Sequence, residues 1–282
     1  MSESASLLEL IEARIGSGAV TLPPMDDTAL RLREIANREN VEIGEIVELI
    51  ESDQALAAEV LRVANSSLYG GLTEVATTRA AIVRIGMSEV VRLAIMASEK
   101  GRYQMRDREL HAYMAPLWQH AAAAAQASRW LASRLGYAAE ENEAFLAGLL
   151  HDIGKLLIFC ALDEIKRAGE LGVPLTDALL TELLDAQHAA MGHRLVSSWQ
   201  LPSVYAEVIR DHHAPTVDPS HTVLLLVRLA DHACVRLGVG LRHDPSINLE
   251  ATPEADALGA TPIMLAEMEV MLEEKLELAG TV

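Results

Sequence analysis

Apolar residues recur at helical spacing along nearly the whole chain, and short turn signals separate one apolar segment from the next. In the segment 54–64, for example, Leu56, Val60 and Val63 fall on one face of a helix. The same period predicts further helices over residues 111–135, 176–199, 203–213, 221–237 and 263–278. Nearly every segment is therefore predicted to be helical, and the predicted fold class is all-α.

One polar segment, residues 99–109, holds many charges and few apolar residues. We place an internal boundary there. It predicts one helical lobe over residues 1–108 and a second lobe over residues 109–282 that ends in a C-terminal helix. Residues 238–261 are rich in Gly, Pro and Asp, and are predicted to form an irregular loop.

Composition supports the helical prediction and narrows the range of partners. Half of the 282 residues are hydrophobic but only 4% are aromatic, and the abundant Ala and Leu are strong helix formers. The net charge of −18 argues against DNA as a binding partner, because binding to a phosphate backbone depends on clusters of Lys and Arg. The N-terminus lacks a basic region, and no apolar run is expected to approach the length of a membrane span. We therefore expect a cytoplasmic protein that binds neither DNA nor a membrane.

A histidine and an aspartate interrupt the most apolar part of the chain. The run Gly148-Leu149-Leu150-His151-Asp152-Ile153-Gly154-Lys155 lies in a segment predicted as one buried helix over residues 141–162. Burying an imidazole and a carboxylate is costly unless they are paired or bound to something. Adjacent residues of these two types can ligate a divalent metal ion. The rest of the chain supplies further candidate ligands: His120, His188, His212, His213 and Asp231.

Such ligands, drawn from several helices of a bundle, would form a metal site of a well-attested kind. Imidazole and carboxylate donors suit Fe, Mn, Zn or Mg, and the sequence does not choose among them. Lys155 follows the His-Asp pair by three to four residues, so it can project toward the same site and contact a phosphate. The alternatives are histidines that form structural hydrogen bonds in a helical core and a lysine that is solvated.

Many short motifs, in order, resemble the HDOD domain (HD-related output domain) over about residues 20 to 235. In the first half these are Pro23-Pro24, Glu51-Ser52-Asp53-Gln54-Ala55-Leu56, Leu61-Arg62-Val63-Ala64-Asn65-Ser66 and Ala80-Ala81-Ile82-Val83-Arg84-Ile85-Gly86. In the second half they are the run from Gly148 to Gly154, Glu182 with His188 and Gly192, Trp199-Gln200-Leu201-Pro202, and Ile209-Arg210-Asp211-His212-His213. The resemblance implies a two-lobed, all-helical bacterial signalling module with a bundle like that of HD phosphohydrolases in its second half.

The resemblance also assigns the candidate ligands to two sets. The HD superfamily pattern places its ligands at His120, His151, Asp152 and Asp231. The related HD-GYP phosphodiesterases carry additional ligands of a multi-metal centre where this chain has His188, His212 and His213. After His213, however, the chain reads Ala214-Pro215-Thr216-Val217, without a Gly-Tyr-Pro element. This departure argues against hydrolysis of cyclic di-GMP and leaves metal binding open.

Two functions are consistent with the sequence. The first is a signalling module that acts through a protein partner or a small ligand such as a nucleotide or phosphate, with the metal centre in a structural or sensory role. The second is a metal-dependent phosphohydrolase acting on a nucleotide or other phosphoester, in which Asp152 and Lys155 would be catalytic. The apolar stripe of the last helix, including Met264, Met268 and Met271, is expected in the core or in a contact between subunits of a homo-oligomer.

Overall fold

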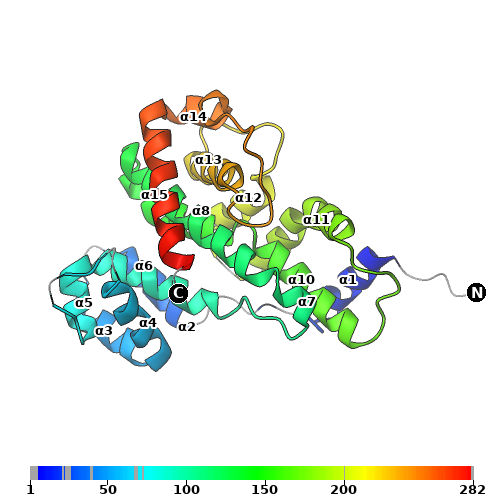
Figure 1. The fold of residues 1–282 in the computed structure, drawn as a ribbon, viewed down its shortest axis with the longest axis horizontal. Coiled ribbons are helices and arrows are strands. Elements are labelled where there is room, and N and C mark those ends of the chain that lie inside the picture. Colours follow the sequence, from blue (N-terminus) through cyan, green and yellow to red (C-terminus); the bar gives the residue numbers. More distant parts are fainter. Residues whose placement is uncertain are drawn as a thin grey trace, which may run out of the picture. The chain divides into compact units, whose positions relative to one another are not determined.

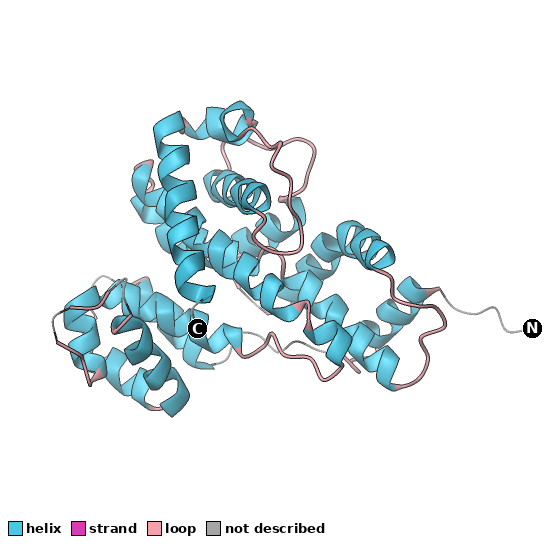
Figure 2. Cartoon of the chain, viewed as in Figure 1, coloured by secondary structure: helices cyan, strands magenta, loops and turns pink. Residues whose placement is uncertain are grey.

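The computed structural model describes residues 6–280 except 21, 23–26, 39–40, 67–68, 72 and 200. Helices and turns account for the regular structure of these residues, which contain no strand (Figures 1 and 2). The all-α prediction is confirmed. The chain divides into two compact units: a larger one made of Met1–Leu22 and Gln104–Leu276, and a smaller one made of Pro23–Tyr103 and Glu277–Val282.

The smaller unit is built from five short helices around an aliphatic core. They are α2 (Asp27–Ala36), α3 (Ile43–Glu51), α4 (Gln54–Ala64), α5 (Thr78–Ile85) and α6 (Met87–Lys100). Side-chain caps set two of the helix starts: Asp53 accepts hydrogen bonds at the start of α4, and Thr77 does so at the start of α5. Ile46, Val60 and Val90 are fully buried in the core.

The larger unit carries the candidate ligands. Its elements are α1 (Leu7–Gly16), α7 (Arg108–His111), α8 (Met114–Arg134), η1 (Ala138–Glu140), α9 (Glu141–Leu150), α10 (Ile153–Arg167), α11 (Asp177–Ser197), α12 (Ser203–Asp211), α13 (Thr222–Leu237), η2 (Leu249–Ala251), α14 (Pro253–Leu258) and, as far as Leu276, α15 (Pro262–Gly280). Our boundary at residue 108 places α1 in the first lobe. In the structure α1 packs on α10, and Arg14 forms an ion pair with Glu170 (2.5 Å).

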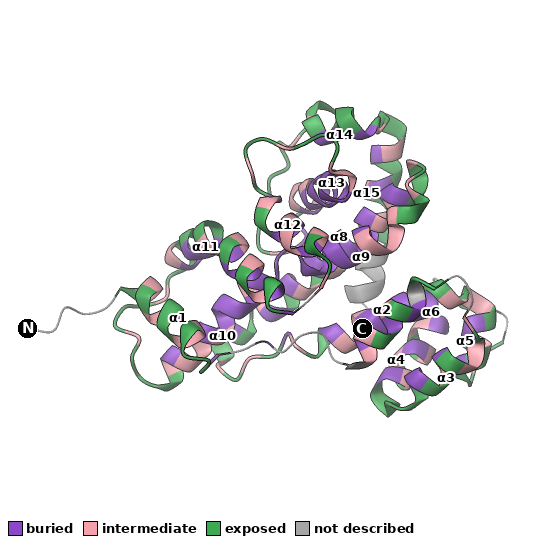
Figure 3. Ribbon diagram, turned by 180° about the vertical axis from the view of Figure 1, so that it is seen from behind, coloured by how far each residue is buried: buried purple, intermediate pink, exposed green. Residues whose placement is uncertain are grey.

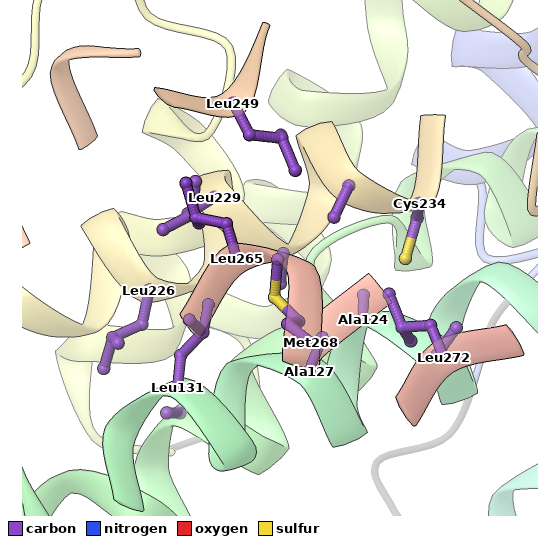
Figure 4. Packing of buried hydrophobic residues seen from close by; sticks show 14 of the residues in the cluster. Ala124, Ala127, Leu131, Leu226, Leu229, Cys234, Leu249, Leu265, Met268 and Leu272 are labelled. Carbon is purple, nitrogen blue, oxygen red and sulfur yellow. The ribbon is translucent and has the colours of Figure 1, made fainter. Parts of the chain in front are cut away.

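Small residues let the central helices of the larger unit approach closely. Ala124 and Ala127 on α8 are fully buried against α13 and α15 (Figure 4). On α9, a Cβ added to Gly148 would lie 2.8 Å from the carbonyl oxygen of Ala124, so this crossing requires glycine. The helices α8, α9 and α13 are largely buried as a result (Figure 3). From α15, Met268 and Leu272 reach the same core.

Two sequence predictions about helix limits are wrong. The helix expected over residues 141–162 breaks at His151 and Asp152, because Asp152 takes φ −102° and ψ 12°, a sparsely populated region where active-site residues often lie. The loop expected over residues 238–261 contains the helix α14. Its start signals are Thr252 as N-cap and Pro253 at the first helical position.

The stretch Ala138–Arg167 also departs from expectation. It is long and apolar enough to cross a membrane by length and composition, whereas we expected no such run. Its most apolar window is 89% buried inside the larger unit. A core helix of a globular protein has these same properties, so the stretch is weak evidence for membrane insertion.

Candidate metal centre

All seven candidate ligands converge in the larger unit, although they come from four helices and one helix break. The break between α9 and α10 carries the His-Asp pair, and the end of α12 carries two adjacent histidines. Six of the seven side chains are buried, and one histidine, at position 213, is exposed. Their ligand atoms form two sets, each within 4.8 Å: His120, His151 and Asp231, which we call the first donor group, and Asp152, His188, His212 and His213, the second donor group.

The first donor group joins α8, the helix break and α13. The Nε2 atoms of His120 and His151 are 3.1 Å apart. Oδ1 of Asp231 lies 3.1 Å from Nε2 of His120 and 3.8 Å from Nε2 of His151. One carboxylate oxygen and two imidazole nitrogens thus face a common point.

The second donor group joins the helix break to α11 and α12. The Nε2 atoms of His188 and His212 are also 3.1 Å apart. The ring of His213 lies against both, with centroid distances of 5.1 Å to His188 and 4.1 Å to His212. The close crossing of α10 and α11 places His188: a Cβ added to Gly154 would lie only 1.9 Å from the His188 carbonyl oxygen.

Asp152 faces both groups with different oxygens. Its Oδ2 lies 3.3 Å from Nε2 of His120 and 3.5 Å from Nε2 of His151. Its Oδ1 lies 3.3 Å from Nε2 of His188 and 3.6 Å from Nε2 of His212. This Oδ1 atom is buried and has no hydrogen bond from the described residues. A buried carboxylate oxygen without a donor is costly, and a cation would satisfy it.

Backbone carbonyls fix the orientation of four histidine rings. Each ring places its Nδ1 against a carbonyl oxygen: His120 on Val239 (2.9 Å), His151 on Gly148 (2.7 Å), His188 on Leu184 (2.6 Å) and His212 on Ile209 (2.8 Å). Because a carbonyl oxygen can only accept, Nδ1 carries the hydrogen in each ring. A neutral imidazole then presents a lone pair at Nε2. This is the arrangement in which metal-ligating histidines are held.

Charge in the centre also suits a metal ion. Burial lowers the pKa of His151 and of His188 to about 4, so both rings are neutral at pH 7. The pKa of Asp152 is held well below its usual range: burial opposes this, but the nearby Lys155 and His151 outweigh it. Metal binding requires neutral imidazoles and ionised carboxylates, and His151, His188 and Asp152 have those forms.

Lys155 lies at the centre, as expected, but its ammonium group contacts a carboxylate. Its Nζ is 2.5 Å from Oδ2 of Asp152. A pocket beside this ion pair, partly open to solvent, is lined by the two residues and by Leu117, His120, His213, Asp231, Val235, Leu241 and Arg242. Sequence analysis missed Arg242, because it lies in a segment predicted only as irregular loop and belongs to no recognised motif.

Comparison with known proteins fits this architecture. The sequence pattern of the HDOD domain matches residues 22–215. A protein of Treponema pallidum (strain Nichols), called "Uncharacterized protein", is 26% identical over 208 residues, which are 72% of this chain and 40% of that protein. The chain therefore spans about two fifths of the length of this relative.

Three solved structures are similar over most of the chain. An HDOD domain protein with unknown function from Geobacter sulfurreducens is 22% identical, with a TM-score of 0.73 over 95% of both chains. A "Putative phosphohydrolase" from Shewanella amazonensis SB2B is 25% identical, with a TM-score of 0.60 over 96% of this chain and 94% of that one. A "Putative signal transduction protein" from Marinobacter aquaeolei VT8 is 25% identical, with a TM-score of 0.68 over 99% of this chain and 66% of that one. Because the domain pattern covers more than half of the sequence, the chain belongs to the HDOD family.

Proposed function

We propose that this chain is a signalling module with a two-metal centre, and that the centre binds a phosphorylated small molecule. The observation that carries the proposal is the position of Asp152. Its two oxygens face two separate sets of imidazole lone pairs, which is how a carboxylate bridges two metal ions. Mixed imidazole and carboxylate donors favour Mn, Fe or Zn over Mg, which prefers oxygen ligands.

The pocket beside the centre supports a phosphorylated ligand. Lys155 and Arg242 line it, and they provide two cationic groups in a chain whose net charge is −18. When a metal ion takes over the neutralisation of Asp152, the ammonium of Lys155 becomes available to an anion. A guanidinium can bind phosphate with two hydrogen bonds. The ligand would then bridge these side chains and the metal centre.

Hydrolysis of a phosphoester is the second candidate, and the opening of the pocket favours it. Structural metal sites are closed, whereas catalytic sites keep a coordination position open. Here the pocket reaches His120 and Asp231 of the first donor group as well as Asp152. A bound metal would lower the pKa of a coordinated water, while Lys155 would hold the phosphate and Asp152 the metal. The Shewanella neighbour's name agrees with this candidate, and the Marinobacter neighbour's name agrees with a signalling role.

A signalling module also requires a downstream binding partner. We propose a protein partner rather than DNA, because the strongly acidic chain would repel a phosphate backbone.

Thermal unfolding of chelator-treated protein tests the metal centre. Free Mn²⁺ at about 100 times its dissociation constant should stabilise the fold by about 2.7 kcal/mol. For a chain of this size that raises the melting temperature by about 5–10 °C. A melting temperature that does not respond to Mn²⁺, Fe²⁺ or Zn²⁺ would refute the centre.

Binding of inorganic phosphate to the Mn²⁺-loaded protein tests the ligand. Lys155→Met and Arg242→Met should each weaken binding about tenfold, the equivalent of about 1.4 kcal/mol. Lys166→Met is the matched control, since Lys166 is on the same helix and pairs with Asp107 away from the pocket (2.9 Å). Equal phosphate affinity in all three variants would rule out the pocket. Mn²⁺-dependent turnover of a chromogenic phosphodiester, abolished in Asp152→Ala, would establish the second candidate.

A further inference from the structure

A buried ion pair lies behind the second donor group and includes none of the candidate ligands. Arg228 on α13 donates from Nε to Oε1 of Glu254 on α14 at 2.6 Å. Glu254 is fully buried, and Arg228 is only 8% exposed. Burying two charges is expensive and, on average, adds little to stability. The role of this ion pair is therefore better explained by the backbone groups that Arg228 also binds.

The guanidinium of Arg228 holds the end of α12. Its Nη1 donates to three carbonyl oxygens: those of Asp211 (3.3 Å), His212 (3.0 Å) and Ala214 (2.8 Å). The last carbonyls of a helix have no donor within the helix, and a cation at this end also interacts favourably with the helix dipole. These carbonyls lie on both sides of His213. One side chain thus fixes the backbone that directs two adjacent histidines into the second donor group.

Glu254 in turn fixes Arg228. A buried guanidinium needs a counter-charge, and Glu254 supplies it from the first turn of α14. The helix α14 lies outside residues 22–215, to which the HDOD pattern extends. A segment beyond the matched domain therefore contacts, through one arginine, the backbone of the metal-binding turn.

We propose that Arg228 is a positioning residue for the second metal ion and that Glu254 holds Arg228 in place. This inference rests on the proposed two-metal centre. It predicts that the C-terminal segment is required for full metal loading, and that loss of the pair affects the second donor group (His188, His212 and His213 with Asp152) more than the first.

The test is Mn²⁺ stoichiometry and affinity of the full-length protein, with electron paramagnetic resonance to show whether bound ions are coupled. Arg228→Met alone would leave the buried Glu254 carboxylate without its counter-charge and would destabilise the fold. The double variant Arg228→Met/Glu254→Met avoids this problem because it removes both charges. Replacing a buried ion pair by apolar residues is often neutral for stability. Arg228→Lys keeps the charge but loses the planar group that reaches several carbonyls.

The matched control is Arg236→Met/Glu269→Met. This ion pair (3.3 Å) also starts from α13, but it leads to α15 rather than to the turn after α12. We expect the wild type and this control to bind two coupled Mn²⁺ ions. The double variant at 228 and 254, and Arg228→Lys, should bind one ion as tightly as the wild type. Their affinity for the second should fall about 10- to 100-fold, as for other groups that orient metal ligands, and the coupled signal should be lost.

Three results would overturn the inference. One is unchanged affinity for both ions in the double variant. Another is wild-type affinity for the second ion in Arg228→Lys, which would show that only the charge of Arg228 matters. The third is an equal loss of affinity for both ions, which would indicate a general loss of structure. A wild type that binds no Mn²⁺ is a separate outcome, because it refutes the two-metal centre and the inference with it.

Discussion

The Nε2 atoms of His120 and His151 face each other at 3.1 Å, although both rings donate their Nδ1 hydrogen to backbone carbonyls. Two neutral rings held in this way would point lone pairs at one another, which is unfavourable unless a cation or a proton lies between them. His120 can take the proton: burial opposes it, but the hydrogen bond with Asp231 and the charge of Asp152 raise its pKa. A metal ion would replace that proton and satisfy both rings at once.

Asp152→Asn should remove both metal ions, because this residue faces both donor groups. An amide lacks the charge and keeps only one ligating oxygen. We expect the affinity for each ion to fall by about 100-fold or more, beyond the usual loss for an orienting residue. His120→Gln and His188→Gln, each in one donor group, should mainly lose one ion. Calorimetric titration with Mn²⁺ measures all three variants, and wild-type stoichiometry in Asp152→Asn would show that Asp152 does not bridge.

The metal-free protein should lose stability as the pH falls from about 6.5 to about 4. In the folded state burial lowers the pKa of His151 and of His188 to about 4, whereas in the unfolded chain both take up protons near pH 6.5. The unfolded state therefore binds more protons in this window, and acid favours it. His120, whose pKa is raised, contributes a constant stabilisation below pH 6.5. Asp152 and Asp231 lose their contribution only below about pH 3.8.

Urea unfolding of chelator-treated protein measures this effect. The free energy of unfolding should be roughly 2–4 kcal/mol lower at about pH 5 than at about pH 7. The variant His151→Gln/His188→Gln should show a smaller difference, because glutamine does not titrate. The difference that remains comes from His213, because burial also lowers the pKa of that ring, to about 3. Equal pH dependence in the variant and the wild type would contradict the neutral, buried state of these histidines.

Gly154→Ala should destabilise the crossing of α10 and α11. The added Cβ would lie 1.9 Å from the His188 carbonyl oxygen and 2.7 Å from the backbone nitrogen of Gly192, so backbone rather than a flexible side chain would have to move. We expect a loss of about 3 kcal/mol or more, at the upper end for overpacking. Gly172→Ala is the control: nothing lies within 4 Å of its added Cβ, and its effect should stay within about 0.5 kcal/mol. Similar melting temperatures for the two variants would show that the close crossing is not required.

The sequence predicts the helices well because their buried faces repeat with the helical period. The prediction of helix limits fails where the chain leaves the helical conformation at the candidate site. The break at His151 and Asp152 lies inside an apolar run, so hydrophobicity alone continues the helix through it. The candidate ligands could be found because a buried His-Asp pair requires partners, and because their order matches a known family.

Other features of the site depend on contacts between residues far apart in the chain. The position of Asp152 between the two donor groups arises from the packing of four helices around one carboxylate, which no local pattern records. Arg228 and Glu254 are 26 residues apart, and each alone resembles an ordinary surface charge on an amphipathic helix. The grouping of α1 with α10 likewise depends on tertiary packing rather than on any break in composition.

The most direct test of the two-metal centre is anomalous X-ray scattering from crystals grown with Mn²⁺. We predict two peaks per chain, on either side of the Asp152 carboxylate and about 3.5–4 Å apart, the usual spacing in two-metal sites. One peak should lie beside Nε2 of His120 and His151, and the other beside Nε2 of His188 and His212. Crystals without a peak at either position, in which Oδ1 of Asp152 hydrogen-bonds only to protein or water, would contradict the account.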